Sequence, residues 1–499
     1  MPRSATTRSV ALAMFAGGLT ALGQAPFGLT LVSLFGLGVG IWTVSEARAW
    51  RSAAAFGWAF GFGYFLVCLH WIVEPFLVDP VRHGWMAPFA LVLLPGGLAL
   101  FWGTAGALAT RLRPGAARRL GFAAALALAE VARGYVLTGF PWALLGSIWL
   151  DTAVAQSARF LGLHGLSALT VMTIACTLAL WSALEGPRRS LAAVPLVGVF
   201  GALFVYGLPH TAPVPAPSDA PLVRLVQPNA AQDLKWDPEF VQVFYERQLT
   251  LSTGEIQADL IVWPETAISQ PLGSASSLLE QISRFTQGRP VILGANRWRL
   301  DGPANALAVI GPRGEIEALY DKAHLVPFGE YVPLGNVAAR LGIRGLAARE
   351  GGGFAPGPGP QLLDMGRLGI ALPLICYEAI FPQFGRTLSQ RADWMVQITN
   401  DAWFGRFAGP QQHLAIARFR SIERGLPLIR VANTGVSAMI DARGRVLEAL
   451  PLNTTGALDA ALPSRLSVPP HARWGDTPTV LILIVLFSSL LILRRGSSD

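Results

Sequence analysis

The chain has 499 residues, of which 52% are hydrophobic and only 14% are charged. Because soluble domains contain roughly a quarter charged residues, this composition excludes an ordinary soluble protein and indicates an integral membrane protein. The formal net charge of +8 comes largely from arginines in short loops between apolar runs. The polar part of the chain has no basic stripe with interleaved aromatic residues, so a nucleic-acid partner is not expected.

Eight apolar runs approach the length of about 20 residues that crosses a bilayer core of roughly 30 Å. They cover residues 8–24, 29–45, 53–74, 86–110, 119–137, 162–184, 191–208 and 477–493. Arginines in the short loops concentrate on the side of the two termini, and basic residues are retained on the cytoplasmic side of a membrane. We therefore expect cytoplasmic termini, a domain of seven transmembrane helices over 1–209, an extracytoplasmic block over 220–465, and a last transmembrane helix over 477–494.

The first apolar run has a second interpretation as a cleaved signal peptide, because Arg3 and Arg8 precede it and small residues follow it. Cleavage would leave seven spans and would place the new N-terminus outside. The block over 220–465 would stay on the same side of the membrane.

A linker rich in proline and alanine, residues 210–221, precedes the polar block. Apolar, β-branched runs then alternate with helical stretches, as in layered α/β folds whose strands are buried on both faces. After the first run, LVRLVQP, they cover residues 260–265, 291–296, 306–311, 370–378, 394–401 and 428–435. Helices are expected from residues 238, 276 and 410, the last with a glycine cap. The Gly- and Pro-rich stretch 326–360 predicts an irregular segment such as a lid.

A carboxylate, an ammonium and a thiol each end a strand-like run of the polar block: Glu265, Lys322 and Cys376. Each has an ordinary alternative, since Glu265 could be a solvated turn residue, Lys322 an exposed hairpin residue and Cys376 a core thiol. Three such residues at strand ends, where an α/β sheet opens into a crevice, favour an acyl-transfer site. The glutamate would take the thiol proton, and the lysine would lower the thiol pKa and stabilise an oxyanion.

The other two cysteines, Cys68 and Cys176, lie in apolar runs, and no CxxC or metal-ligand spacing occurs. Cys376 therefore has no disulfide partner within the polar block. A single thiol kept in an oxidising compartment is best explained by catalysis.

Three short motifs around these residues, WPE at 263–265, YDK at 320–322 and CYE at 376–378, resemble in order the motifs of the nitrilase superfamily, which uses a Glu-Lys-Cys triad. Four further segments are similar to those of the bacterial apolipoprotein N-acyltransferase family: APFG at 25–28, TGFPW at 138–142, VPFGEYVP at 326–333 and TNDAWFG at 399–405. The resemblance implies an α-helical membrane bundle with an α/β nitrilase-like αββα sandwich domain. It also implies that Glu265 is the general base, Lys322 the oxyanion-stabilising residue and Cys376 the nucleophile.

Further residues around the triad are expected to support it or to bind substrate. By the resemblance these are Glu330, Tyr377, Glu378 and Trp236, together with Trp403 in TNDAWFG. Phe328 and Tyr331, with Val332 and Leu334, belong to the predicted lid and would contact acyl chains or, alternatively, serve ordinary packing. His324 and His413 receive no role beyond structure.

The resemblance implies the last step of lipoprotein maturation in the bacterial inner membrane. An acyl chain would pass from a phospholipid, expected to be phosphatidylethanolamine, to a cysteine thioester and then to the α-amino group of a lipoprotein's diacylglyceryl-cysteine. The catalytic block would face the periplasm. No metal or soluble cofactor is expected, because the acyl donor is itself a membrane lipid.

Two other functions stay open at this point. A membrane-anchored nitrilase-type amidase acting on a small amide would use the same triad, although eight spans exceed what an anchor needs. A transporter with an extracytoplasmic binding domain would normally place several ionisable residues within its spans, whereas Glu130 is the main one here. TGFPW is expected to be either a re-entrant turn or an aromatic anchor at the membrane surface.

Overall fold

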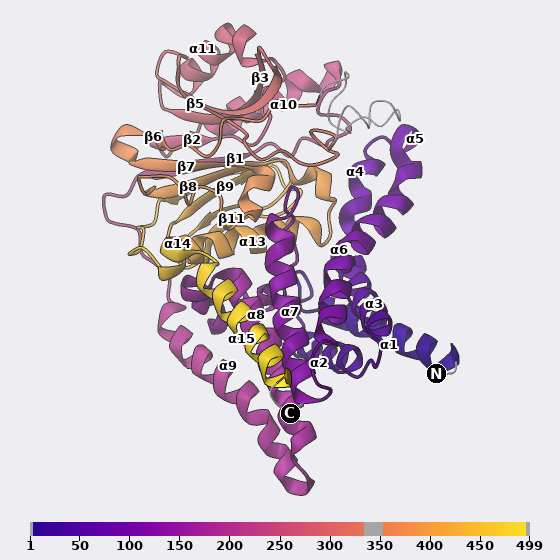
Figure 1. Cartoon of the computed structure of the whole chain (residues 1–499). Helices are drawn as coiled ribbons and strands as arrows, with labels where there is room; N and C mark the ends of the chain where they lie inside the picture. Colours follow the sequence, from indigo (N-terminus) through magenta and orange to yellow (C-terminus); the bar gives the residue numbers. More distant parts are fainter. Residues whose placement is uncertain (1–2, 334–352, 496–499) are drawn as a thin grey trace. The chain divides into compact units, whose positions relative to one another are not determined.

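The computed structural model describes residues 3–333 and 353–495, and the chain divides into two compact units. The first unit contains Met1–Ala212 and Pro469–Asp499, and the second contains Pro213–Val468 (Figure 1). Leu334 and most of the Gly-rich part of the predicted lid lie outside the described residues.

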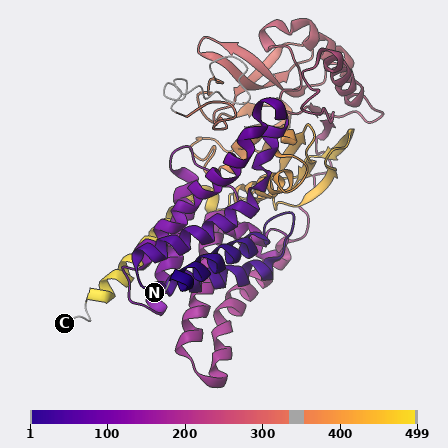
Figure 2. The same ribbon diagram turned by 90° about the vertical axis from the view of Figure 1, so that its right-hand side faces the viewer.

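In the first unit, every apolar run of the sequence forms a helix. These helices are α1 (Arg3–Ala21), α2 (Thr30–Ser45), α3 (Trp50–Cys68), α6 (Ala87–Ala109), α7 (Ala116–Tyr135), α8 (Ala158–Ala183), α9 (Val194–Gly207) and α15 (Thr477–Arg495). The short helices between or before them are α4 (Glu74–Leu77), α5 (Pro80–His83) and α14 (Pro470–Trp474). Figure 2 shows the long helices running side by side, with α8 and α9 protruding as a hairpin.

Among the described residues, four helical segments are long and apolar enough to cross a membrane, or five if α3 and the helix bent by 65° after it form one span. The four are Pro80–Ala109, Ala153–Ala183, Gly186–His210 and Thr477–Arg494. Helix α2 has only 16 residues, and α7 carries two arginines near its start and an ion pair further along. The eight helices are present, and eight membrane spans remain a prediction.

A buried ion pair lies in α7. Arg133 Nη2 is 2.8 Å from Glu130 Oε2, and both side chains are 1% exposed. Trp102 of α6 donates to Glu130 Oε1 at 2.9 Å, while Arg133 Nη1 donates to the carbonyls of Phe140 and Trp142. Arg133 thus satisfies the irregular backbone of TGFPW, as non-helical chain requires where water is absent. Trp142 is itself buried, and the choice between a re-entrant turn and an aromatic anchor for TGFPW stays a prediction.

Replacing Glu130 tests how much this pair stabilises the helical unit. Glu130→Ala leaves Arg133 buried without its anion, and breaking one side of a buried pair costs about 3–5 kcal/mol. We expect a clear drop in the thermal unfolding temperature of the detergent-solubilised chain. The double variant Glu130→Ala with Arg133→Met removes the unpaired charge but also the donor of the Phe140 and Trp142 carbonyls. We expect it to lose less than Glu130→Ala alone, and an equal or larger loss would show that the unpaired charge costs no more than these two carbonyls.

The second unit contains two six-stranded sheets, whose strand orders are β12-β1-β2-β3-β4-β5 and β11-β10-β9-β8-β7-β6. The strands of the first are β1 (Leu222–Gln227), β2 (Leu260–Val262), β3 (Val291–Arg299), β4 (Gly302–Ile310), β5 (Ile316–Asp321) and β12 (Gly456–Ala461). Those of the second are β6 (Leu363–Asp364), β7 (Ile370–Ile375), β8 (Trp394–Thr399), β9 (Leu428–Ala432), β10 (Ser437–Ile440) and β11 (Val446–Leu450). Strands β1–β2–β3 and β7–β8–β9 are parallel, and the outer strands pair antiparallel.

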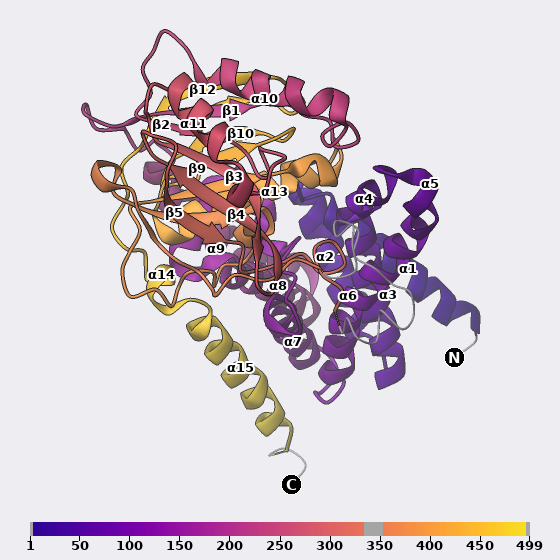
Figure 3. The same ribbon diagram turned by 90° about the horizontal axis from the view of Figure 1, so that it is seen from above.

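Helices cover the outer faces of the two sheets, which gives the predicted αββα layers. Helices α10 (Pro238–Ser252) and α11 (Ser276–Phe285) lie over the first sheet, and α13 (Gly409–Arg424) lies over the second (Figures 1 and 3). Beneath α10, Trp263 is fully buried and donates from Nε1 to Ser252 Oγ at 2.7 Å. Helix α13 is capped at its C-terminus by Gly425 in the left-handed conformation, which confirms the glycine cap predicted from the sequence.

Candidate active site

The three predicted catalytic residues all follow strands of the second unit. Glu265 comes three residues after β2, and Lys322 and Cys376 come directly after β5 and β7. Their exposed fractions are 6%, 1% and 5%. The alternatives of a solvated turn glutamate and an exposed hairpin lysine are therefore wrong. Buried polar groups need partners, so the partners define what the site can do.

One ammonium lies between two carboxylates. Lys322 Nζ donates to Glu330 Oε1 at 2.8 Å and lies 3.5 Å from Glu265 Oε1. Burial opposes the charge of Lys322, but Glu330 and Glu265 outweigh it and raise the lysine pKa. The ammonium is thus retained in a buried position. Glu330, which the resemblance assigned a supporting role, is the residue in direct contact with Lys322.

Two asparagines that the sequence analysis did not single out hold the carboxylates. Asn305 in β4 donates from Nδ2 to Glu265 Oε1 at 2.7 Å and to Glu330 Oε1 at 3.4 Å. The backbone N–H of Asn400 donates to Glu265 Oε2 at 2.8 Å. Both oxygens of Glu265 therefore accept hydrogen bonds from fixed donors. An amide side chain inside the otherwise apolar β4 was the available signal for Asn305.

Cys376 starts a sharp turn at the end of β7. Its φ is +52°, a left-handed backbone conformation that non-glycine residues adopt at a cost of about 1–3 kcal/mol. Gln397 of β8 donates from Nε2 to the Cys376 carbonyl at 3.1 Å. The chain changes direction at Cys376. The hydrogen bond from Gln397, on the neighbouring strand β8, fixes the Cys376 carbonyl in this turn.

The thiol of Cys376 is a weak acid in this setting. Burial raises its pKa, the Glu265 carboxylate raises it further, and the Lys322 ammonium opposes both. Cys376 therefore rests as a neutral thiol, which would need a base before it could act as a nucleophile. Glu265 is the carboxylate whose charge acts most strongly on the thiol, ahead of Asp401.

Glu378 ties the Cys376 turn to the chain around Lys322. Its Oε1 accepts from the hydroxyl of Tyr320 at 2.6 Å and from the N–H of Ala323 and of His324 at 2.7 and 3.0 Å. Its Oε2 accepts from the N–H of Ile375 at 2.8 Å. Burial raises the pKa of Glu378 to about 7, against the effect of these donors. Glu378 thus fixes the β5 and β7 ends relative to each other.

A second buried network lies behind the nucleophile, and it includes His413, which the sequence assigned only a structural place. Burial lowers the pKa of His413, although Asp401 opposes this, so the ring is neutral. His413 donates from Nδ1 to Asp401 Oδ1 at 2.9 Å and accepts at Nε2 from Gln397 at 3.1 Å. Arg430 donates to Gln397 Oε1 and Asp401 Oδ2. The network orients Gln397 toward the Cys376 carbonyl.

Within residues 3–333 and 353–495, histidine, cysteine, aspartate and glutamate side chains form no group of three that could hold a metal ion. The Asp401 carboxylate is instead occupied by Arg430 and His413. Burial disfavours its charge, but these two partners lower its pKa to about 2.

The remaining predicted residues lie around this cluster with different exposures. Tyr377 is buried against Phe381, with ring centroids 5.1 Å apart. Trp236 is half-buried at the rim of a cavity, and Trp403 is half-buried three residues after Asn400. In the lid, Phe328 is 59% exposed, and its N–H donates to the carbonyl of the half-buried Tyr331 at 2.7 Å. The exposed fractions of these side chains do not show what they bind, so their substrate-binding roles stay predictions.

Replacing Glu378 tests the tie between the two strand ends. In Glu378→Gln, an amide N–H₂ group replaces one of the two carboxylate oxygens. Depending on the orientation of the amide, this group faces either the Ile375 N–H or the three donors at Oε1, so at least one buried donor loses its acceptor. A lost buried hydrogen bond costs about 1–3 kcal/mol. We expect a lower unfolding temperature and faster proteolysis of the second unit. The matched control is Glu448→Gln on the exposed strand β11, which should unfold at the same temperature as the unaltered chain. If Glu378→Gln also kept the stability of the unaltered chain, the proposed role of the Glu378 carboxylate would be contradicted.

Each of the two units matches a known protein family. A family profile described as Apolipoprotein N-acyltransferase N-terminal domain matches residues 16–177, and one described as Carbon-nitrogen hydrolase matches residues 222–467. Among solved structures, an amidase from Nesterenkonia sp. AN1 aligns with a TM-score of 0.38 and 18% identity over 54% of this chain and 98% of the amidase.

Full-length relatives carry both units together. The chain is 37% identical to the apolipoprotein N-acyltransferase of Rhodopseudomonas palustris, over 97% of this chain and 95% of that protein. It is also 37% identical to the apolipoprotein N-acyltransferase of Caulobacter vibrioides, over 95% of this chain and 93% of that protein. The second unit has the nitrilase-like carbon-nitrogen hydrolase fold, and the chain belongs to the apolipoprotein N-acyltransferase family.

Proposed function

We propose that Cys376 is the nucleophile of an acyltransferase that moves an acyl chain from a phospholipid to the α-amino group of a lipoprotein's N-terminal diacylglyceryl-cysteine. The supporting observation is that Lys322 lies between Glu265 and Glu330, and that the charges of Lys322 and Glu265 act on the Cys376 thiol. Membership of the acyltransferase family supplies the reaction class. The donor is phosphatidylethanolamine in this proposal.

The first half-reaction forms a thioester. Glu265 takes the proton of the Cys376 thiol while the sulfur attacks the ester carbonyl carbon of the phospholipid. The negative charge that develops on the carbonyl oxygen is stabilised by the Lys322 ammonium, which Glu330 and Glu265 keep protonated. The C–O bond of the ester then breaks, and Glu265 returns the proton to the leaving lysophospholipid.

The second half-reaction forms an amide. The α-amino group of the diacylglyceryl-cysteine attacks the thioester carbonyl, and Glu265 accepts a proton from the nitrogen. The C–S bond breaks, and that proton passes to the Cys376 sulfur, which restores the resting thiol. The ester's free energy is carried through the thioester, so the reaction needs no further source of energy.

A membrane substrate requires the site to work at the bilayer surface. The apolar helices of the first unit suit an inner-membrane location with eight spans, cytoplasmic termini and a periplasmic catalytic unit in this proposal. Both partners of the reaction, the phospholipid and the apolipoprotein, would then reach the site from the same bilayer leaflet.

The first experiment detects the thioester directly. Detergent-purified protein is incubated with phosphatidylethanolamine and no acceptor, and its intact mass is measured. We expect a hydroxylamine-sensitive adduct of one acyl chain on the unaltered chain and on Cys176→Ser, and none on Cys376→Ser. If the folded protein stays unmodified while the lipid is intact, the acyltransferase proposal fails and a small-amide hydrolase becomes the function to test.

The lid is tested at its exposed aromatic residue. Phe328 lies two residues before Glu330 and is 59% exposed, so a carboxylate there should disfavour contact with acyl chains without disturbing the core. Phe328→Asp is expected to slow thioester formation about tenfold, which corresponds to about 1.4 kcal/mol of transition-state stabilisation. Phe285→Asp, at an exposed phenylalanine at the end of α11, is the control and should leave the rate unchanged. Unchanged kinetics in Phe328→Asp would rule out lipid contact at this residue.

A further inference from the structure

The chain uses arginine almost everywhere a basic residue occurs. Of its 39 lysines and arginines, only two are lysines, Lys235 and Lys322. Both are buried in the second unit, and both act electrostatically on Glu265. Lysine and arginine are not equivalent where geometry matters, because an ammonium is a compact point charge and a guanidinium is a broad planar fork. The proposed mechanism uses Lys322 and gives Lys235 no task.

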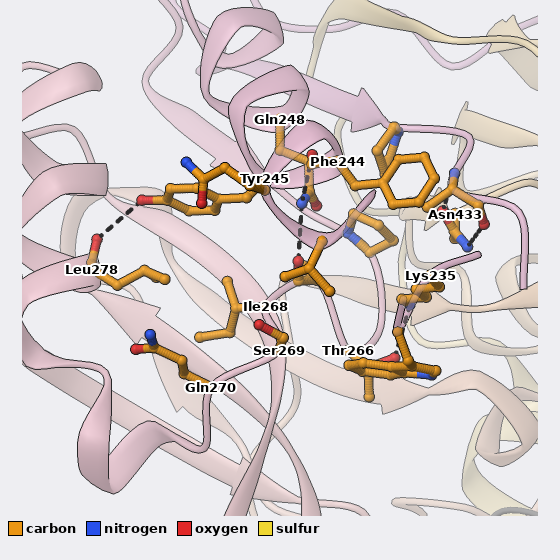
Figure 4. A pocket seen from close by; sticks show the side chains of 17 residues that line it. Lys235, Phe244, Tyr245, Gln248, Thr266, Ile268, Ser269, Gln270, Leu278 and Asn433 are labelled. Atoms are coloured by element: carbon orange, nitrogen blue, oxygen red, sulfur yellow. Dashed lines mark hydrogen bonds between the residues drawn. The ribbon is translucent and has the colours of Figure 1, made fainter. Parts of the chain in front are cut away.

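Lys235 holds the backbone of the turn that carries the general base. It lies before α10, and its Nζ donates to the Glu265 carbonyl at 3.2 Å and to Thr266 Oγ1 at 3.0 Å. The same ammonium lies 5.5 Å from the centroid of the Trp236 ring. Figure 4 shows Lys235 beside Thr266 at the wall of a cavity of about 110 Å³. Lys235 therefore contacts the backbone carbonyl and the threonine of the turn, whereas Lys322 contacts the Glu265 carboxylate.

The turn needs such support because its backbone is strained. Thr266 has a φ of +47°, a left-handed conformation that is unfavourable for a β-branched residue. The turn also lies so close to β3 that a Cβ on Gly294 would come within 2.6 Å of the Glu265 Cα and the Thr266 nitrogen. Gln248 of α10 donates to the next carbonyl, that of Ala267, at 2.9 Å. Side chains from outside the turn thus satisfy its buried carbonyl groups.

The positive charge of Lys235 balances the negative charges of the site. Glu265 and Glu330 bring two carboxylates, and Lys322 alone brings one ammonium. Lys235 adds a second positive charge next to Glu265. Burial lowers the pKa of Lys235 to about 8, with Glu265 opposing this, so the ammonium form predominates at neutral pH.

We propose that Lys235 is a positioning residue for the reaction, which fixes the Glu265 turn and places a compact second ammonium beside the general base. This inference rests on the proposed function of Glu265 and Cys376. Lys235 touches neither the thiol nor the carboxylate oxygens, so it acts through Glu265. An arginine would bring the charge without fitting the two acceptors, which explains why the chain keeps a lysine here.

The test measures the rate of Cys376 thioester formation, per folded protein, over a range of phosphatidylethanolamine concentrations in whole-chain variants. Lys235→Ala is expected to slow the maximal rate about 100-fold, the loss typical of a displaced catalytic group, with the half-saturating lipid concentration unchanged. Ethylammonium chloride should recover at least part of this loss by entering the vacated space beside the cavity. Lys235→Arg should be as slow as Lys235→Ala. Arg247→Ala is the matched control, because Arg247 lies on α10 and donates to the Pro228 carbonyl, away from the Glu265 turn.

Each result decides the inference. A Lys235→Ala rate within twofold of the unaltered chain, a loss that ethylammonium does not reverse, or full activity in Lys235→Arg would overturn it. Alkylation of Cys376 by iodoacetamide, read by peptide mass, provides a second rate that needs no lipid. If the unaltered chain forms no thioester, the proposed function fails, while slower alkylation in Lys235→Ala with recovery by ethylammonium still supports the positioning role.

Discussion

The chemistry of the second unit depends on one buried arrangement of charges, in which the Lys322 ammonium lies between the carboxylates of Glu265 and Glu330. None of these groups could be buried alone, because an isolated charge away from water costs several kcal/mol. Together they keep the lysine protonated and the glutamates accepting hydrogen bonds from fixed donors. The asparagines, the tight β3 contact at Gly294 and the Glu378 tie all serve to hold this arrangement in place.

Burial also decides the state of the nucleophile. A solvated cysteine is partly ionised at neutral pH, whereas burial and the nearby Glu265 carboxylate raise the pKa of Cys376. A neutral thiol is protected from adventitious oxidation and alkylation, since the thiolate is the reactive form. In the proposed mechanism, proton transfer to Glu265 couples the appearance of the thiolate to the presence of a substrate carbonyl.

The sequence predicted the parts of this unit that obey strong local rules. Buried parallel strands are continuous apolar runs, so β2, β7, β8 and β9 were predicted close to their observed positions, and the residues at their ends followed. The short strand β6 and the outer strands β10, β11 and β12 were missed, because they are short or mix polar and apolar residues.

The site's supporting residues were less predictable, because hydrogen bonds between distant segments leave no periodic pattern. Asn400 acts on Glu265 through its backbone N–H, which no side-chain motif reveals. His413 was correctly expected on a helix face, yet its Nε2 lies 3.2 Å from the Cys376 carbonyl and 3.1 Å from Gln397 Nε2, contacts between segments that no local pattern predicts. In the first unit, hydropathy placed the helices well, since apolar composition decides helix formation there, while the ion pair of α7 required three-dimensional information.

The two sheets contribute different halves of the proposed reaction centre. Glu265 and Lys322 follow strands of the first sheet, whereas Cys376 and Asn400 follow strands of the second. A chain in which only one sheet has formed would therefore carry a thiol without a base, or a base without a thiol. In the proposed reaction, lipid cleavage therefore requires both sheets to be in place, so a partly folded chain would not cleave the lipids around it.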